Sequence, residues 1–112
     1  MAKKMKILCI CERGNSRSSQ LGWLLKDGLG HDAIAMGIRS NSGETKHMLY
    51  KWAEMIILLD EDFITEIPQE YHKKLKVWNV GKDRFFSFSP ELVSILKQFI
   101  LEEGWEWTRK DM

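Results

Sequence analysis

The sequence predicts a small α/β protein in which helices cover both faces of a four-stranded parallel sheet. Four short segments, 5–10, 33–38, 55–59 and 75–80, are rich in leucine and β-branched residues, as strands are. The third, MIILL, is apolar on both faces, which is typical of a parallel strand buried on both sides. Helical patterns separate the four segments. Such alternation predicts a doubly wound sheet with right-handed crossovers.

Each helical pattern has its own boundary signals. The first begins after the Gly-Asn pair at 14–15 and ends near Gly28, a residue type that commonly follows the last helical turn. A second is expected over 43–54. A third is expected over 89–104, where Pro90 suits the first helical position. The segment 61–74, interrupted by a proline, predicts one or two short helices.

Length and charge limit the classes of function. The 112 residues predict one domain, 1–112, with one core. Seventeen Lys and Arg against sixteen Asp and Glu give a net charge of +1, too even for a surface that binds nucleic acid or acidic lipid. No apolar run approaches the roughly 20 residues of a membrane span. We therefore expect a cytoplasmic protein without a nucleic-acid or membrane partner.

The cysteines and histidines do not predict a metal site. Cys9 and Cys11 are separated by one residue, too close in the chain to cross-link distant parts of a fold, which favours a reducing compartment. His31, His47 and His72 share no ligand spacing, so we expect them at the surface and expect neither a metal nor another cofactor.

The predicted topology also locates a site. Doubly wound sheets bind ligands at the carboxyl ends of their strands, beside the point where the strand order reverses. The segments 11–17, 39–42, 60–62 and 81–84 follow the four predicted strands and should all lie at that edge.

The first of these segments, CERGNSRS at 11–18, leads from a strand into a helix. Free backbone N–H groups and the helix dipole make such a junction a binding site for anions. Gly14 and Asn15 readily adopt the positive φ that a tight cradle of N–H groups requires. These donors, with Arg13 and Arg17, favour the thiolate form of a nearby cysteine. The combination predicts nucleophilic attack on phosphorus or a similar oxyanion centre.

Spacing selects the cysteine. Five residues separate Cys11 from Arg17, enough for the loop to curl around one anion while the guanidinium binds two of its oxygens. The sixth residue after Cys9 is the uncharged Asn15. Cys9 is therefore interpreted as part of the strand's buried core.

Cys11, five residues, Arg17 and Ser18, placed between a strand and a helix, resemble the phosphate-binding loop of the low-molecular-weight protein tyrosine phosphatases. AMGIRSNSG and WAEMIILLDED resemble segments of short bacterial and phage proteins of that family. The resemblance implies a phosphotyrosine protein phosphatase I-like fold, with Cys11 as the nucleophile, Arg17 on the transferring phosphoryl group and Ser18 donating to the thiolate. It also implies that the rest of the loop binds phosphate, namely Glu12, Arg13, Gly14, Asn15 and Ser16.

The family supplies a proton to the leaving group from an Asp-Pro pair after the last strand. Here Asp83 is the expected general acid, although Arg84 replaces the proline, and Asp60 is the alternative because it also follows a strand. Phe85 is expected to wall the slot for an aromatic ring. Two further differences lie in the loop: the Gly-Asn pair comes one residue later, and Ser16 stands where the family often has a second cysteine.

The leading hypothesis is a phosphatase that hydrolyses aryl phosphate esters such as phosphotyrosine through a phosphocysteine intermediate. Its ligands would be a phosphorylated protein or a small aryl phosphate, and inorganic phosphate or another oxyanion. One alternative is an arsenate reductase, which would need an external thiol because no cysteine follows Cys11. Another is a catalytically weak module that binds phosphate or phosphoprotein. A cysteine phosphocarrier is disfavoured because Arg17 would stabilise hydrolysis.

Overall fold

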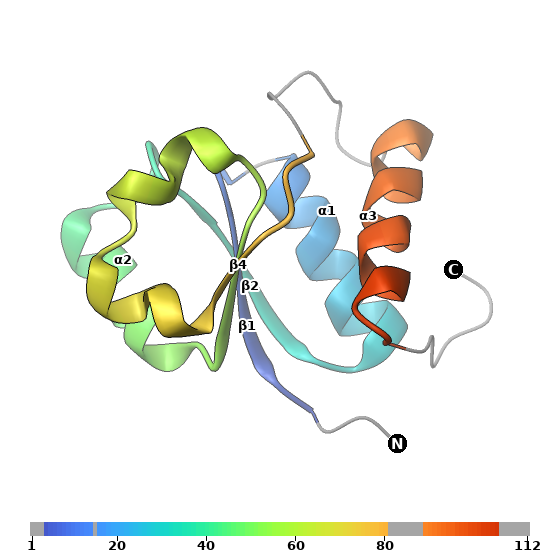
Figure 1. Ribbon diagram of the computed structural model, residues 1–112, viewed down its shortest axis with the longest axis horizontal. Coiled ribbons are helices and arrows are strands. Elements are labelled where there is room, and N and C mark those ends of the chain that lie inside the picture. Colours follow the sequence, from blue (N-terminus) through green and yellow to red (C-terminus); the bar gives the residue numbers. More distant parts are fainter. Residues whose placement is uncertain (1–3, 15, 81–88, 106–112) are drawn as a thin grey trace.

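Four parallel strands form a single sheet at the centre of the protein. The computed structural model describes residues 4–14, 16–80 and 89–105. The strands are β1 (Lys6–Cys11), β2 (Asp32–Gly37), β3 (Met55–Leu58) and β4 (Leu75–Val77). They lie in the order β2-β1-β3-β4, and every neighbouring pair is parallel (Figure 1). The predicted four-stranded parallel sheet is therefore confirmed, with β4 three residues long instead of six.

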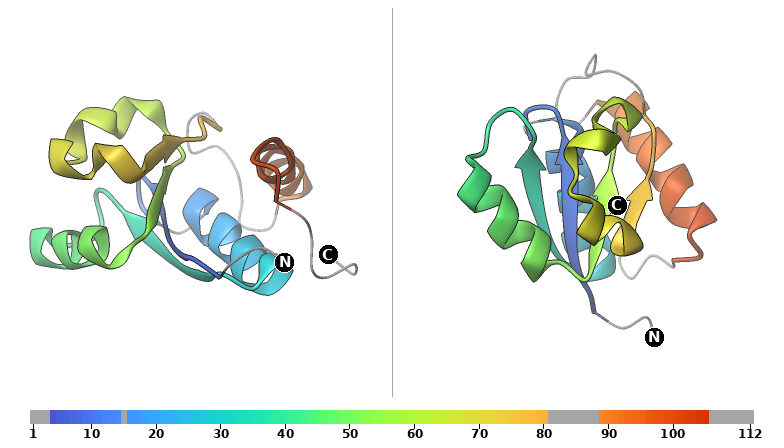
Figure 2. Two further views of the ribbon diagram at one scale, coloured as in Figure 1. Left: turned by 60° about the horizontal axis from the view of Figure 1, so that its bottom comes forward. Right: turned by 60° about the vertical axis from the view of Figure 1, so that its left-hand side comes forward.

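Helices cover both faces of the sheet. On one face lie α1 (Arg17–Trp23), continued by the π-helical turn η1 (Leu24–Gly28), and α3 (Pro90–Glu102). On the other lie α2 (Gly43–Trp52) and the 3₁₀ segments η2 (Glu61–Glu66) and η3 (Gln69–Lys74) (Figures 1 and 2). The two 3₁₀ segments are the short helices expected between 61 and 74. They are separated at Pro68, which cannot continue a helix.

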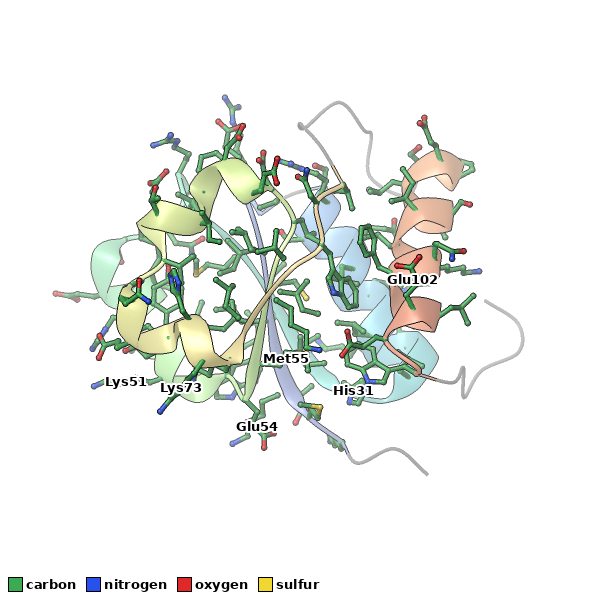
Figure 3. All side chains as sticks on the ribbon, viewed as in Figure 1. His31, Lys51, Glu54, Met55, Lys73 and Glu102 are labelled. Carbon is green, nitrogen blue, oxygen red and sulfur yellow. The ribbon has the colours of Figure 1, made fainter. Side chains whose placement is uncertain are left out.

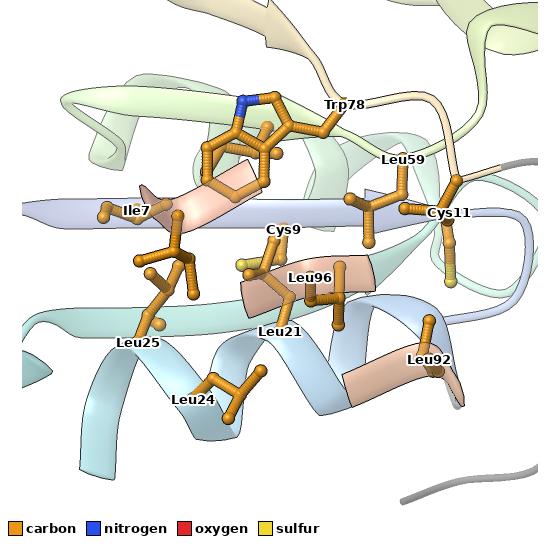
Figure 4. Packing of buried hydrophobic residues seen from close by; sticks show 14 of the residues in the cluster. Ile7, Cys9, Cys11, Leu21, Leu24, Leu25, Leu59, Trp78, Leu92 and Leu96 are labelled. Atoms are coloured by element: carbon orange, nitrogen blue, oxygen red, sulfur yellow. The ribbon is translucent and has the colours of Figure 1, made fainter. Parts of the chain in front are cut away.

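The side chains of β1 alternate between two apolar cores. Cys9 and Leu21 belong to the core beneath α1 and α3, which Figure 4 shows, whereas Leu8 and Ile10 belong to the core beneath α2 and η2. All β1 residues from Ile7 to Cys11 are fully buried. Because β1 is packed on both faces, its carboxyl end is held in place, and so is the start of the segment that follows it.

His31 is buried, so the expectation of a surface position is wrong for this histidine. Its side chain lies at the amino end of β2, where Nδ1 accepts a hydrogen bond from the backbone N–H of Met5 at 3.0 Å (Figure 3). The ring of Trp105, which follows α3, packs against it with 5.4 Å between ring centroids. Burial lowers the pKa of His31. Because Trp105 is distant from His31 in the sequence, no local sequence pattern indicates that His31 is buried.

The described residues contain neither a membrane-spanning helix nor a cluster of metal-ligating side chains. No helix among them is long and apolar enough to cross a membrane. Within the same residues, no three His, Cys, Asp or Glu side chains gather in a way that could hold a metal ion.

Candidate active site

The candidate site lies where the chain leaves β1 and β3 in opposite directions. The connection after β1 enters α1 on one face of the sheet, and the connection after β3 enters η2 on the other. In a sheet of order β2-β1-β3-β4 this is the point of strand-order reversal, where doubly wound proteins bind ligands. The segment 11–18 and Asp60 flank it, as the sequence predicted for the strand ends.

Cys11 begins the site. It is the last residue of β1, one position beyond the predicted strand end, and it is fully buried. The backbone N–H of Gly14 donates a hydrogen bond to its Sγ at 3.2 Å, and the Ser18 hydroxyl lies 3.1 Å from the same sulfur. Two polar groups therefore meet the sulfur from the loop and from the first turn of α1.

The segment after β2 holds the first two carbonyl groups of the loop from outside. The Ile38 N–H donates to the Cys11 carbonyl at 3.0 Å, and the Arg39 N–H donates to the Glu12 carbonyl at 2.8 Å. These contacts join the two residues that follow β2 to the last residue of β1 and the first residue of the loop.

Two serine hydroxyls hold the next two carbonyl groups. Ser40 Oγ donates to the Arg13 carbonyl at 2.7 Å, and Ser19 Oγ donates to the Gly14 carbonyl at 2.7 Å. The C=O and N–H of a trans peptide unit point in opposite directions. Carbonyl groups fixed on the outside therefore turn the N–H groups of residues 12, 13 and 14 toward the inside of the loop. The Gly14 N–H, which donates to Cys11 Sγ, has this orientation.

Two glycines allow the loop to lie against the end of β2. Gly14 has φ of 75°, and a Cβ placed there would lie 2.7 Å from the backbone nitrogen of Gly37. A Cβ on Gly37 would lie 2.4 Å from the carbonyl carbon of Arg13. Side chains at either position would push the backbones apart.

Arg17 is the first residue of α1, and its side chain is completely buried. Its Nη1 donates to Oδ2 of Asp60 at 3.2 Å. Asp60 is itself buried and caps η2, because its Oδ1 accepts a hydrogen bond from the Asp62 N–H at 3.0 Å. Both carboxylate oxygens of Asp60 are thus engaged, one by the guanidinium and one by the backbone.

The rim of the site carries a second guanidinium. The Arg39 side chain lies over the Phe63 ring, 5.3 Å from its centroid, and 3.7 Å from a carboxylate oxygen of Glu66. Asn41 Oδ1 accepts a hydrogen bond from the Gly37 N–H at 2.9 Å. The Arg39 contacts join the segment after β2 to η2, the 3₁₀ segment after β3, whereas the Asn41 hydrogen bond holds the segment after β2 to the end of that strand.

Cys9 differs from Cys11 in its surroundings, although both side chains extend from β1 toward α1 (Figure 4). Burial raises the pKa of the Cys9 thiol far above its ordinary value, and the neighbouring Cys11 adds to the effect. No polar partner of Cys9 occurs among the described residues. Cys9 therefore remains a neutral thiol in the core, as the sequence predicted.

Most of the predicted site residues lie together in one loop. The structure brings together Cys11, Glu12, Arg13, Gly14, Ser16, Arg17 and Ser18. Asn15, Asp83 and Phe85 lie outside the described residues. Sequence reasoning did not find the supporting roles of Ser19, Gly37 and Ser40, nor the pairing of Asp60 with Arg17. The placement of 39–42 and 60–62 at the strand ends was the available signal for Ser40 and Asp60.

This sheet order, with a loop of this kind after β1, is the fold of the low-molecular-weight protein tyrosine phosphatases. The chain is similar to YwlE arginine phosphatase from Geobacillus stearothermophilus, with a TM-score of 0.62 and 17% sequence identity over 89% of this chain and 93% of that one. It is also similar to Vibrio vulnificus Wzb, solved in complex with benzylphosphonate, with a TM-score of 0.59 and 17% identity over 89% of this chain and 94% of that one.

The sequence matches no protein-family model and no curated protein. At 17% identity the structural likeness shows the fold, and the function is argued from the site itself.

Proposed function

We propose that this protein is a phosphatase that hydrolyses aryl phosphate esters, phosphotyrosine among them, through a phosphocysteine intermediate. One observation carries the proposal: the Cys11 sulfur accepts the Gly14 N–H inside a loop whose carbonyl groups at residues 11–14 are held by hydrogen bonds on the outside. A thiolate at the centre of inward N–H groups, with a buried arginine at the end of the loop, suits attack on a phosphoryl group.

Binding of the phosphate comes first. The inward N–H groups at 12–14 and the Arg17 guanidinium would hold the non-bridging oxygens, and these donors need no rearrangement when charge develops on them. Asp60 acts through Arg17 as a positioning residue, since it fixes the guanidinium at 3.2 Å. Preorganised donors of this kind stabilise the transition state more than the bound substrate.

Cys11 Sγ then forms a bond to phosphorus while the bond from phosphorus to the ester oxygen breaks. Asp83, just after the fourth predicted strand, donates the proton that the departing phenolate oxygen takes up. Water attacks the phosphocysteine in the second step and gives its proton to the Asp83 carboxylate, which releases inorganic phosphate and regenerates both the Cys11 thiolate and the acid. The Ser18 hydroxyl, 3.1 Å from Sγ, stabilises the sulfur as it leaves.

The contacts of Asp60 argue against its acting as the acid. Asp60 already accepts hydrogen bonds at both oxygens, from Arg17 and from the Asp62 N–H. A carboxylate committed to a buried cation would have to give up that ion pair in order to carry a proton. We therefore assign Asp60 to positioning and Asp83 to proton transfer.

The test is hydrolysis of p-nitrophenyl phosphate by the purified protein. Cys11→Ser is expected to abolish turnover, because a serine hydroxyl is a far weaker nucleophile at neutral pH. Cys9→Ala is the matched control: it removes the other thiol of the same strand and should retain turnover. Mass spectrometry of the acid-quenched wild-type enzyme should detect one phosphate on the peptide that contains Cys11.

Three outcomes would contradict the proposal. Phosphate binding without turnover on any aryl phosphate would indicate a binding module. Turnover that survives in Cys11→Ser would exclude the phosphocysteine route. Arsenate-dependent oxidation of glutathione or thioredoxin, without hydrolysis of phosphate esters, would indicate the reductase.

The substrate class can be tested in the same assay. One structural neighbour is an arginine phosphatase, so peptides that carry phosphoarginine should be compared with peptides that carry phosphotyrosine. We expect kcat/KM to be higher for phosphotyrosine. A higher value for phosphoarginine would keep the phosphocysteine chemistry but overturn the aryl assignment.

A further inference from the structure

The strand β2 lies at an edge of the sheet, and three of its residues direct their backbone N–H and C=O groups outward. The N–H groups of Asp32 and Ile38 point inward and donate to the carbonyl groups of Met5 and Cys11, at 2.9 and 3.0 Å. Alternate residues of a strand direct their N–H and C=O groups to opposite sides. The odd-numbered residues at 33, 35 and 37 therefore face away from β1.

One of these three outward positions is already satisfied inside the protein. The Gly37 N–H donates to Asn41 Oδ1 at 2.9 Å, which closes the upper end of the edge. Ala33 and Ala35 remain, and no described residue pairs with their outward backbone groups. The open part of the edge is therefore two hydrogen-bonding residues long, and Ile34 lies between them.

The two edges of the sheet differ in how they resist pairing. β4 is only three residues long and carries Lys76, and short, charged strands are common protections of exposed edges. β2 is six residues long, and its sequence DAIAMG contains no proline and no lysine. Its one charged residue, Asp32, lies at its first position, so the rest of this longer edge is the part suited to pairing with another strand.

A groove runs beside this edge on the α1 face. Its volume is about 400 Å³, and it is lined by Ser19, Gly22, Trp23, Lys26, Asp27, Ala33 and Ala35. The Trp23 side chain is 38% exposed there, and Ile34, on the opposite face of the same edge, is 37% exposed. Apolar surface thus flanks the open backbone groups on both sides, as it does at strands that pair with a partner.

We propose that a second copy of this chain pairs with β2 in an antiparallel arrangement, about a twofold axis that passes beside Ile34. In this register Ala33 of one copy faces Ala35 of the other, and each such pair exchanges two N–H···O=C bonds. Both open residues of both copies are then satisfied. Ile34 meets its own counterpart in the narrow pair between them, where side chains pack closest.

Other registers satisfy less of the edge. A shift by two residues places Ala33 opposite Ala33 and leaves Ala35 facing position 31, which precedes the strand. A shift by one residue turns inward-bonding residues toward the partner. A shift by two residues in the other direction places Ala33 opposite Gly37, whose N–H already donates to Asn41. The register centred on Ile34 is thus the one that matches the pattern of open groups.

The charged residues that line the groove also favour a second copy of this chain as the partner. A twofold axis brings each surface patch against its own copy, so a patch that carries one sign of charge repels itself. The groove contains one cation, Lys26, and one anion, Asp27, and therefore meets a second copy with both signs present. The result is a continuous eight-stranded sheet across two copies, with the candidate active sites outside the new interface.

Cross-linking tests the register. Ile34→Cys places a thiol at the axis, and Met48→Cys is the matched control, because Met48 is an apolar residue of α2 that is 64% exposed. Both variants carry Cys11→Ser, so the buried Cys9 is the only other thiol. Under mild oxidation, Ile34→Cys should form the disulfide-linked dimer at least about tenfold faster, since Cα atoms of a narrow pair lie within disulfide range. Equal rates would overturn the proposal.

Sedimentation equilibrium tests whether the dimer forms through β2, without introducing a new thiol. Ala35→Pro removes an outward N–H that β1 does not use, and extended backbone at Ile34 is compatible with a following proline. This variant should sediment as a monomer with an unchanged circular dichroism spectrum, whereas Ala35→Ser, which keeps the N–H, should remain a dimer like the wild type. A wild-type protein that stays monomeric up to about 100 μM would overturn the proposal and leave this edge to a strand from another protein.

Discussion

Arg17 and Asp60 form a buried ion pair that joins the loop after β1 to the loop after β3. Arg17 Nη1 lies 3.2 Å from Asp60 Oδ2, and the two side chains are 0% and 7% exposed. The attraction within a buried pair is largely offset by the loss of hydration, so such a pair adds little net stability. Its main effect is geometric: it fixes the guanidinium of the proposed phosphate site against a residue of the neighbouring strand.

Asp60→Asn should reduce both activity and stability. It removes the charge that balances Arg17 and leaves a buried cation uncompensated, which costs about 3–5 kcal/mol of the free energy of unfolding. The guanidinium would also lose its fixed direction, and misplacement by about 1 Å can lower a rate about 100-fold. Urea denaturation measures the first effect. The second is kcat for p-nitrophenyl phosphate, measured at a temperature at which the variant remains folded.

Asp62→Asn is the matched control for this change. Asp62 belongs to the same turn of η2, but its side chain is exposed and its backbone N–H, which donates to Asp60, is retained. Activity and stability should remain within about 0.5 kcal/mol of the wild type, as is usual for surface substitutions. Equal losses in both variants would show that activity and stability depend on the negative charge of this turn in general, and not on the ion pair with Arg17.

Gly37→Ala should lower activity by displacing the loop at 11–18, although Gly37 itself belongs to β2. The new Cβ would lie 2.4 Å from the carbonyl carbon of Arg13, a backbone atom that can move only if the loop moves with it. We expect kcat/KM to fall at least about tenfold and the free energy of unfolding to fall by about 1–3 kcal/mol, as in other overpacked sites. Gly43→Ala, where a Cβ meets no atom within 4 Å, should change neither quantity appreciably. A fully active Gly37→Ala would show that the loop tolerates displacement.

The sequence predicted the sheet well because the relevant signals are local. An apolar strand segment, a helix boundary and the spacing of Cys11 from Arg17 are each defined by residues that are close together in the sequence. The length of β4 was overestimated: it ends at Val77, although the apolar residues Trp78 and Val80 follow it. Beyond Val77 the chain still contacts β3 through Trp78, but the regular pairing has ended.

The supporting contacts of the site were not predicted, because each joins residues far apart in the chain. Arg17 and Asp60 are separated by 43 positions, and Ser40 lies 27 positions from the Arg13 carbonyl that it holds. Topology predicted only that the strand-end segments meet at one edge. Which side chain would pair with which carbonyl depends on register and packing, and the residue types alone do not specify either.

Ser18→Ala should slow the second half of the proposed reaction. The Ser18 hydroxyl lies 3.1 Å from Cys11 Sγ, and a hydrogen bond to a charged group contributes about 1.5–3 kcal/mol. Its loss should reduce kcat by about 10- to 100-fold, and the phosphocysteine should accumulate because its sulfur is a poorer leaving group. Rapid-quench measurement of the phosphoenzyme tests this. Ser94→Ala, at an exposed position of α3, is the control; phosphoenzyme that fails to accumulate would argue against a role for Ser18 in this step.

His31 should make the stability of the protein depend on pH. Nδ1 accepts a hydrogen bond from the Met5 N–H, so the folded protein requires the neutral ring, and burial lowers the pKa of His31. As pH falls below about 6.5, the unfolded chain takes up a proton before the folded one does. The free energy of unfolding should therefore be highest above that pH and fall by up to about 1.4 kcal/mol per pH unit below it, until the folded protein is protonated as well. Urea midpoints measured between pH 7.5 and 5 should follow this slope in the wild type and in His47→Gln, whose histidine is exposed. His31→Gln should lose the slope, and a variant that keeps it would show that carboxylates cause the acid sensitivity.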